Sequence, residues 1–142
     1  MSTNRLLHTM LRVGNLQRAI DFYVNSLGMR HLRTCDIPME EYTLAFVGYG
    51  TEMEGSVIEL TYNYGVEKYD IGKGYGHICI EVDDVPAQVA KCRANGVKVI
   101  YVSEPEGAEG EEKAVFMAFV EDPDGYQVEM LNRKLFRKTC SK

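Results

Sequence analysis

Apolar and polar residues follow the same order twice along this chain. Residues 5–13 alternate between the two classes, as a strand with one buried face does, and residues 16–27 carry apolar residues at helical spacing. Three further strand-like stretches complete the order, which starts again at residue 76. The stretches expected to form elements are 5–13, 16–27, 29–35, 42–49 and 57–63 in the first copy, and 76–82, 86–95, 97–102, 114–121 and 126–131 in the second.

Matched residues at the start and the end of each copy indicate an internal repeat. His8 and His77 each precede a valine by five residues, and Glu59 and Glu129 each lie in the last expected strand. The separation from histidine to glutamate is 51 residues in one copy and 52 in the other. Two copies of one module explain this match better than chance does, and a repeat sets the architecture of a chain.

The repeat predicts an α+β protein of two βαβββ modules, with a concave mixed sheet that lines a metal cleft. The first module is expected over residues 5–64 and the second over residues 76–132. Residues 65–75, which include three glycines, are expected to link the modules, and residues 133–142 are expected to form a C-terminal tail.

Alternation along the strands separates an aliphatic face, expected to pack on the helices, from a polar face. The polar face carries four candidate residues at matched positions, His8, Glu59, His77 and Glu129. A lone histidine or glutamate on a strand is usually an ordinary surface residue, and His31, which has no partner in the repeat, is interpreted in that way. Four matched residues favour a shared site instead.

Two imidazoles and two carboxylates form a ligand set for a divalent metal ion. Mixed nitrogen and oxygen donors exclude a tetrathiolate zinc site and suit nickel, cobalt, manganese, iron or zinc. Four protein ligands leave coordination positions open, which is typical of a catalytic metal rather than a structural one. The four residues therefore predict a metal-dependent enzyme.

Length, charge and cysteine content weigh against several other classes of function. The chain has 142 residues and a net charge of −5, so non-specific binding to nucleic acid is not expected. The basic cluster at residues 133–138 is interpreted as part of a solvated tail. The sequence has no long apolar run and no signal-peptide pattern, and its four cysteines lack CxxC spacing. Reduced thiols in a cytoplasmic protein are therefore predicted.

Long stretches of the sequence resemble glyoxalase I, or lactoylglutathione lyase, a family of the vicinal-oxygen-chelate superfamily. The similarity covers residues 7–132 and is greatest to the short bacterial and trypanosomatid enzymes. The matching stretches are LLHTMLRVGNLQRAIDFYVNSLGM, YTLAFVGYG, VIELTYNYGV, YGHICIEVDD and AFVEDPDGYQVEML. The resemblance implies isomerisation of the methylglyoxal–thiol hemithioacetal to the S-D-lactoyl thioester through an enediolate, which detoxifies methylglyoxal.

The resemblance also implies an assembly and a division of roles. It implies a homodimer with shared active sites, in which His8 and Glu59 of one chain meet His77 and Glu129 of the other. Nickel or cobalt is the implied metal, with zinc as an alternative, and the thiol cosubstrate is glutathione or trypanothione. Glu129 matches the main catalytic base of the family, and Glu59 would serve the opposite face of the substrate.

Four further residues are predicted to bind substrate. Arg12 lies four residues after His8 on the same strand face, about 13 Å along it, where it would reach a carboxylate of the thiol peptide. A structural ion pair is the alternative role for Arg12. Asn63, four residues after Glu59, is expected to bind the peptide backbone, and Tyr101 and Lys113 complete the set.

The loop at residues 103–113 departs from the family pattern. Glutathione-using members have a basic loop that receives the glycyl carboxylate, whereas this loop contains one lysine, Lys113, and five glutamates. The five are Glu104, Glu106, Glu109, Glu111 and Glu112. An acidic loop attracts a cation, which favours trypanothione, a glutathione–spermidine conjugate. A solvated loop that contacts nothing is the alternative, and Lys113 keeps glutathione as a candidate.

Two other functions compete with this interpretation. One is another metal enzyme of the same architecture, such as a dioxygenase or a thiol transferase, and the other is a non-catalytic binding module. Dioxygenases of this architecture use two histidines and one glutamate, so a fourth ligand argues against them. Binding modules lack the ligand set, which is complete in this sequence.

Overall fold

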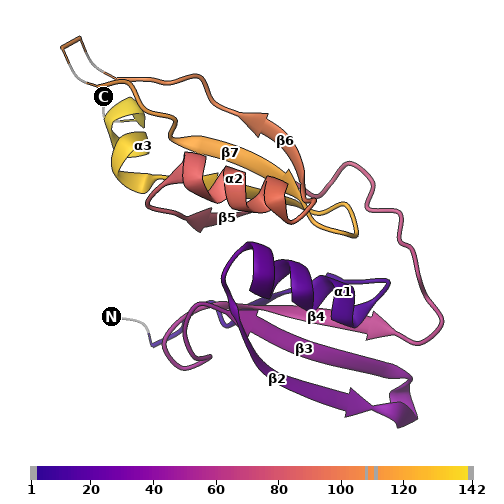
Figure 1. The fold of residues 1–142 in the computed structure, drawn as a ribbon. Coiled ribbons are helices and arrows are strands. Elements are labelled where there is room, and N and C mark those ends of the chain that lie inside the picture. The colour runs from indigo at the N-terminus through magenta and orange to yellow at the C-terminus, as the bar shows by residue number, and fades with distance from the viewer. Residues whose placement is uncertain (1–2, 108, 111, 141–142) are drawn as a thin grey trace. The chain divides into compact units, whose positions relative to one another are not determined.

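The computed structural model describes residues 3–107, 109–110 and 112–140 and divides into two compact units, Met1–Asp70 and Ile71–Lys142. Each unit contains one four-stranded mixed sheet with a helix packed on one face (Figure 1). This arrangement confirms the predicted α+β fold of two repeated modules. Within the described residues, no helix is long and apolar enough to cross a membrane.

The sheet of the first unit has the strand order β1-β4-β3-β2. Strand β1 runs parallel to β4, and the other neighbours are antiparallel. The helix α1 continues directly into a π-helical turn, η1, and a short 3-10 turn, η2, connects β2 to β3. The bounds are β1 His8–Arg12, α1 Leu16–Asp21, η1 Phe22–Ser26, β2 Arg30–Ile37, η2 Pro38–Glu40, β3 Tyr42–Gly48 and β4 Val57–Asn63.

Local signals in the sequence explain where the first helix begins and ends. The side chain of Asn15 accepts a hydrogen bond from the backbone N–H of Arg18, which caps α1. Gly28 has a φ of 75°, a left-handed conformation that glycine adopts without strain, and it ends the helical segment. The predicted helix over 16–27 is therefore confirmed, with its second half widened into a π-helical turn.

The core of the first unit lies between α1 and the aliphatic face of the sheet. The helix contacts β3 and β4, and buried residues of the helix and of the aliphatic strand positions form this core. They are Leu11, Val13, Ala19, Ile20, Tyr23, Ala45, Val47, Ile58 and Leu60. Because this face is covered by the helix, the opposite face keeps its polar side chains accessible.

The second unit repeats this arrangement with the strand order β5-β8-β7-β6. Strand β5 is parallel to β8, and α2 contacts β6 and β7. Asp84 caps α2 by accepting a hydrogen bond from the backbone N–H of Ala87, and Gly96 follows the helix with a φ of 73°. The bounds are β5 His77–Glu81, α2 Val85–Ala94, β6 Lys98–Val102, β7 Met117–Glu121, β8 Gln127–Leu131 and α3 Arg133–Cys140.

The helix α3 occupies a segment for which the sequence predicted only a tail. Its start is capped by Asn132, whose side-chain oxygen accepts from the backbone N–H groups of Lys134 and Leu135 at 3.1 and 3.2 Å. The ring of Phe136 stacks on Phe116, with centroids 6.4 Å apart. A cap and one apolar contact therefore hold a short basic segment as a helix on the second unit.

Candidate metal centre

In the first unit, parallel pairing of β1 with β4 brings His8 and Glu59 together. The register places Glu59 opposite Met10, so His8 lies diagonally across from the carboxylate, two residues away. Nε2 of His8 and Oε2 of Glu59 are 2.9 Å apart. The imidazole is 39% exposed and the carboxylate 15% exposed, so the pair can be reached from solvent through the histidine.

The second unit builds the same pair from His77 and Glu129. Strand β5 pairs with β8 so that Glu129 lies opposite Cys79, again two residues from the histidine. Nε2 of His77 and Oε2 of Glu129 are also 2.9 Å apart, and the side chains are 41% and 13% exposed. The repeat thus preserves strand register, atom-to-atom distance and burial, in addition to sequence spacing.

Each histidine also contacts a phenylalanine on the strand beyond its glutamate. Phe46 pairs with Glu59 across β3 and β4, and its ring makes a T-shaped contact with His8 at 5.7 Å and 72°. Phe119 pairs with Glu129, and its ring meets His77 at 5.0 Å and 86°. Sequence reasoning missed both aromatic residues, although the triplet Ala-Phe-Val occurs around each of them and could have identified them as a matched pair.

The two pairs differ in what the glutamate touches. The hydroxyl of Thr61 donates to Oε1 of Glu59 at 3.0 Å, whereas the residue at the equivalent position of β8 is Leu131. Beside Glu129 lies the thiol of Cys79. Its partial burial, together with the negative charge of Glu129 and a hydrogen bond to that carboxylate, raises the pKa of the thiol to about 12. Cys79 is therefore a neutral thiol at physiological pH.

The donor atoms fit a divalent metal ion in both chemistry and spacing. Two ligand atoms about 2.1 Å from a metal and at right angles to one another are about 3.0 Å apart, close to the 2.9 Å of each pair. The same distance also suits a hydrogen bond between imidazole and carboxylate. Within residues 3–107, 109–110 and 112–140, no three His, Cys, Asp or Glu side chains gather as a metal site. Each pair of histidine and glutamate thus supplies half of the predicted ligand set and is called a half-site, the first from His8 and Glu59 and the second from His77 and Glu129.

The predicted substrate-binding residues of the first unit lie on β1 and β4. Arg12 ends β1, is exposed, and pairs with Thr61 in the register. Asn63 ends β4, and its side-chain amide donates to the hydroxyl of Tyr69 at 2.9 Å. His31, predicted as an ordinary surface residue, is exposed, and its ring is 2.8 Å from the hydroxyl of Thr34.

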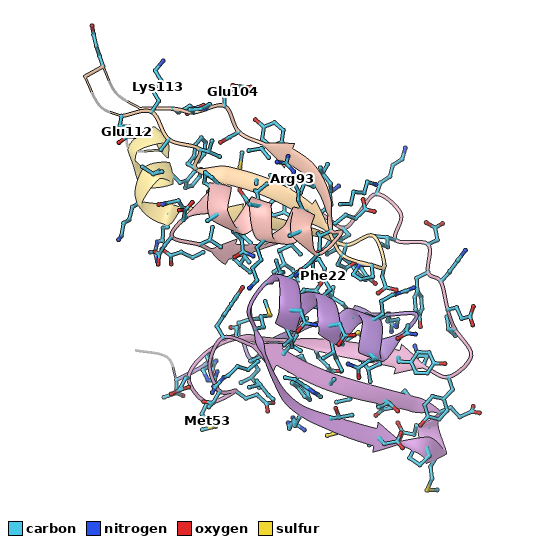
Figure 2. The ribbon with its side chains drawn as sticks, in the orientation of Figure 1. Phe22, Met53, Arg93, Glu104, Glu112 and Lys113 are labelled. Atoms are coloured by element: carbon cyan, nitrogen blue, oxygen red, sulfur yellow. The ribbon has the colours of Figure 1, made fainter. Side chains whose placement is uncertain are left out.

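The predicted substrate-binding residues of the second unit lie on β6 and in the loop that follows it. Tyr101 pairs with Phe119, with ring centroids 6.4 Å apart. The loop carries Lys113 and the four glutamates Glu104, Glu106, Glu109 and Glu112 in exposed positions. Figure 2 labels Lys113, Glu104 and Glu112. Backbone hydrogen bonds between Glu106 and Ala114, both 3.0 Å, close its base. Glu111, one of the five predicted loop glutamates, lies outside the described residues.

A cavity of about 260 Å³ adjoins the histidine of the second unit. Its wall consists of His77, Tyr75, Gln127, Ile71 and three glycines. The hydroxyl of Tyr75 donates to the carbonyl of Gln127 at 3.0 Å, which ties the segment before β5 to the start of β8. Burial and the nearby Asp122 carboxylate raise the pKa of Tyr75 to about 12.

Comparison with known proteins places this chain in a family. The chain belongs to the Glyoxalase/Bleomycin resistance protein/Dioxygenase superfamily, whose family model matches residues 5–130. It is 54% identical over 131 residues to a lactoylglutathione lyase of Escherichia coli O157:H7, covering 92% of this chain and 93% of that protein. A lactoylglutathione lyase of Neisseria meningitidis is 48% identical, with 92% and 91% covered.

A solved structure gives the same result. The trypanothione-dependent glyoxalase I of Leishmania major superposes with a TM-score of 0.83 at 50% identity, covering 96% of this chain and 92% of that one. The predicted resemblance to glyoxalase I is therefore confirmed, and the relatives over nearly the whole length are lyases. This finding favours the predicted lyase over the dioxygenase, the thiol transferase and the binding module.

Proposed function

We propose that this protein is a lactoylglutathione lyase that isomerises the hemithioacetal of methylglyoxal and a glutathione-type thiol to the S-D-lactoyl thioester. The observation that carries the proposal is the duplicated pair of histidine and glutamate, 2.9 Å apart at the same register in both sheets. The similarity to lactoylglutathione lyases over nine-tenths of the chain supports the choice of reaction. The product would be a stable thioester, and the reactive dicarbonyl would be consumed.

The metal would be held by His8, Glu59, His77 and Glu129, two donors from each unit. Nickel or cobalt is our first candidate, and zinc is the alternative, because nitrogen and carboxylate donors suit all three. When bound, the metal supplies Lewis acidity that stabilises negative charge developing on the substrate oxygens. The remaining steps fall to side chains of the protein.

A homodimer would complete the ligand set. Each chain offers His8 and Glu59 from its first unit, and His77 and Glu129 of the partner subunit would supply the other two donors. Apolar surface at the first half-site supports an interface, since Leu6 and Leu7, just before β1, are 68% and 54% exposed. Exposed apolar groups of this kind are commonly covered by a partner. The proposed compartment is the cytoplasm, consistent with the free thiols of the described cysteines.

Proton transfer between the two carbon atoms would be carried out by Glu129. Its carboxylate would take the proton from C1 of the substrate and return it to C2. A shielded position suits this role, because the side chain of Glu129 is only 13% exposed, which limits the access of bulk water. Glu59 accepts a hydrogen bond from the hydroxyl of Thr61, a stronger donor than the Cys79 thiol beside Glu129. Glu59 is therefore less available as the principal base and would serve the opposite face of the substrate.

The thiol peptide would be bound by Arg12, Asn63, Tyr101 and Lys113. Arg12 and Lys113 carry the positive charges for peptide carboxylates, while Asn63 and Tyr101 offer hydrogen bonds. The exposed loop glutamates would attract a cationic linker, so we place trypanothione slightly ahead of glutathione. The similarity to a trypanothione-dependent enzyme supports this choice, whereas the similarity to lactoylglutathione lyases supports glutathione.

The decisive experiment reconstitutes the apoprotein with nickel, cobalt or zinc and measures thioester formation with each thiol. His77→Ala should lose bound metal and activity together. His31→Ala is the matched control, because His31 is exposed and has no partner in the repeat, and it should keep both. Full metal stoichiometry in His77→Ala would contradict the ligand assignment. Activity that survives complete removal of metal would contradict the proposed reaction mechanism.

A further inference from the structure

A row of three side chains crosses the polar face of the first sheet and ends at the metal-ligand pair. The register aligns Arg33 on β2 with Phe46 on β3, and Phe46 with Glu59 on β4. The guanidinium of Arg33 lies over the ring of Phe46, 4.0 Å from its centroid. The same ring makes the T-shaped contact with His8. Although it sits on the polar face, Phe46 is only 5% exposed.

The guanidinium is itself fixed by Glu52. Nε of Arg33 is 2.7 Å from one carboxylate oxygen of Glu52, and Nη2 is 2.9 Å from the other, which is a bidentate pair. Hydrogen bonds from Arg33 hold the pKa of Glu52 below its ordinary value, so both groups are charged at neutral pH. The backbone carbonyl of Glu52 also accepts a hydrogen bond from Arg5, which anchors the loop that carries it.

We infer that Glu52, Arg33 and Phe46 are positioning residues that fix the imidazole of His8 for metal binding. This inference rests on the proposed ligand role of His8. The ion pair is partly exposed, with side chains 48% and 35% accessible, and pairs of this kind add little to stability. Its effect is geometric: a guanidinium held over Phe46 prevents that ring from turning, and the ring in turn limits the rotation of the imidazole.

In the second unit, a different residue contacts the phenylalanine beside the histidine. Tyr101 occupies the place of Arg33, opposite the phenylalanine Phe119, and the two rings are tilted by 56°. The ring of Phe119 then meets His77. One half-site is therefore braced by an ion pair and the other by an aromatic pair. Loss of the ion pair should disturb His8 and leave His77 in place. His77 therefore serves as an internal reference for changes at His8.

The test uses the full-length apoprotein and the imidazole proton signals of its three histidines, measured by NMR. In Arg33→Met and in Glu52→Gln, the His8 signals should shift and broaden, because Phe46 no longer holds the ring. The His77 and His31 signals should keep their wild-type chemical shifts. Arg33→Lys keeps the positive charge without the bidentate geometry and should give an intermediate shift. Arg93→Met, an exposed cation on α2 of the other unit (Figure 2), is the control and should change nothing.

A second readout is nickel affinity, measured by competition with a chelator. Mutation of a residue that orients a metal ligand typically changes metal affinity by about 10–100-fold. Because Arg33 acts on His8 indirectly, through Phe46, Arg33→Met should bind nickel roughly three- to tenfold more weakly. Unchanged His8 signals in both variants would overturn the inference, as would equal shifts of all three histidines. If the wild-type protein binds no nickel, cobalt or zinc, the proposed metal site fails, while the NMR measurement still decides whether these residues position His8.

Discussion

The hydroxyl of Thr61 donates a 3.0 Å hydrogen bond to Oε1 of Glu59. Thr61 is buried, with 7% of its surface exposed, so water does not readily replace it. In the second unit the equivalent residue is Leu131, whose side chain has no hydroxyl. Two glutamates at matched positions are therefore chemically different, because Glu59 accepts from a hydroxyl whereas Glu129 accepts from the thiol of Cys79, which is a weaker donor. This difference gives a physical reason for a single principal base.

Introducing the missing hydroxyl should weaken the proposed base. In Leu131→Thr a new donor would engage Glu129, and a hydrogen bond to a charged group contributes roughly 1.5–3 kcal/mol. We expect kcat for thioester formation to fall about tenfold or more. Leu131→Val has a similar branched shape without the hydroxyl and is the matched control. Equal losses in the two variants would mean that packing at this position, rather than hydrogen bonding to Glu129, limits turnover.

Removing the base itself should have a larger effect. Glu129→Gln keeps the size of the side chain but removes the proton-accepting oxygen, and general bases typically contribute about 10²–10⁴-fold. We expect kcat to fall by roughly 100-fold or more while the fold is largely kept, as judged by circular dichroism and thermal unfolding. Glu59→Gln should have a smaller effect on kcat. Near-normal turnover by Glu129→Gln would show that another group removes the proton.

Alternation and the internal repeat predicted most of the fold. Strand positions, the two helices and the shared face of His8 and Glu59 follow from side-chain periodicity, because burial of the aliphatic face constrains the register. The helix α3 was missed, because its basic composition indicated a solvated tail. The composition does not indicate the cap at Asn132 or the contact of Phe136.

The aromatic neighbours of the histidines were missed for a different reason. Phe46 looks like a core residue by composition, yet it lies on the polar face and is covered by Arg33 and His8. The pairing of Arg33 with Glu52 joins residues that are 19 positions apart in the chain. Contacts of this kind depend on cross-strand register and on loop conformation, which periodicity along one strand does not specify.

The proposed sharing of sites between two chains can be tested by complementation. His8→Ala and His77→Ala homodimers should both be inactive, because every site carries one lesion. In a mixed dimer, one site would carry both lesions and the other would carry none, so each mixed dimer should recover about half of the wild-type activity. A mixture of His77→Ala with Glu129→Gln, two variants expected to be inactive or nearly so, is the control. Both lesions then lie in the same half-site, every site stays damaged, and no recovery is expected.

The acidic loop between β6 and β7 should set the preference between thiols. Glu104, Glu106, Glu109 and Glu112 are exposed around it, and the bridge from Glu106 to Ala114 holds its base closed. Two unit charges a few ångströms apart near a protein surface interact by roughly 1–4 kcal/mol before screening. About 1.4 kcal/mol corresponds to a tenfold change in affinity. A spermidine linker beside one or two of these carboxylates would therefore gain about tenfold over a glycyl carboxylate.

We accordingly expect kcat/KM to be higher for the trypanothione adduct than for the glutathione adduct at low ionic strength. The difference should shrink as salt is added, because dissolved ions weaken the interaction between exposed charges. Replacing Glu104 and Glu112 by glutamine should reduce the difference in kcat/KM between the two adducts at low salt. Glu67 is an exposed carboxylate in the first unit, and Glu67→Gln should leave this difference unchanged. Lys113→Gln should instead weaken the glutathione adduct, because it removes a cation available to the glycyl carboxylate. A wild-type preference for glutathione at every ionic strength would mean that the loop glutamates are solvated and do not take part in thiol selection.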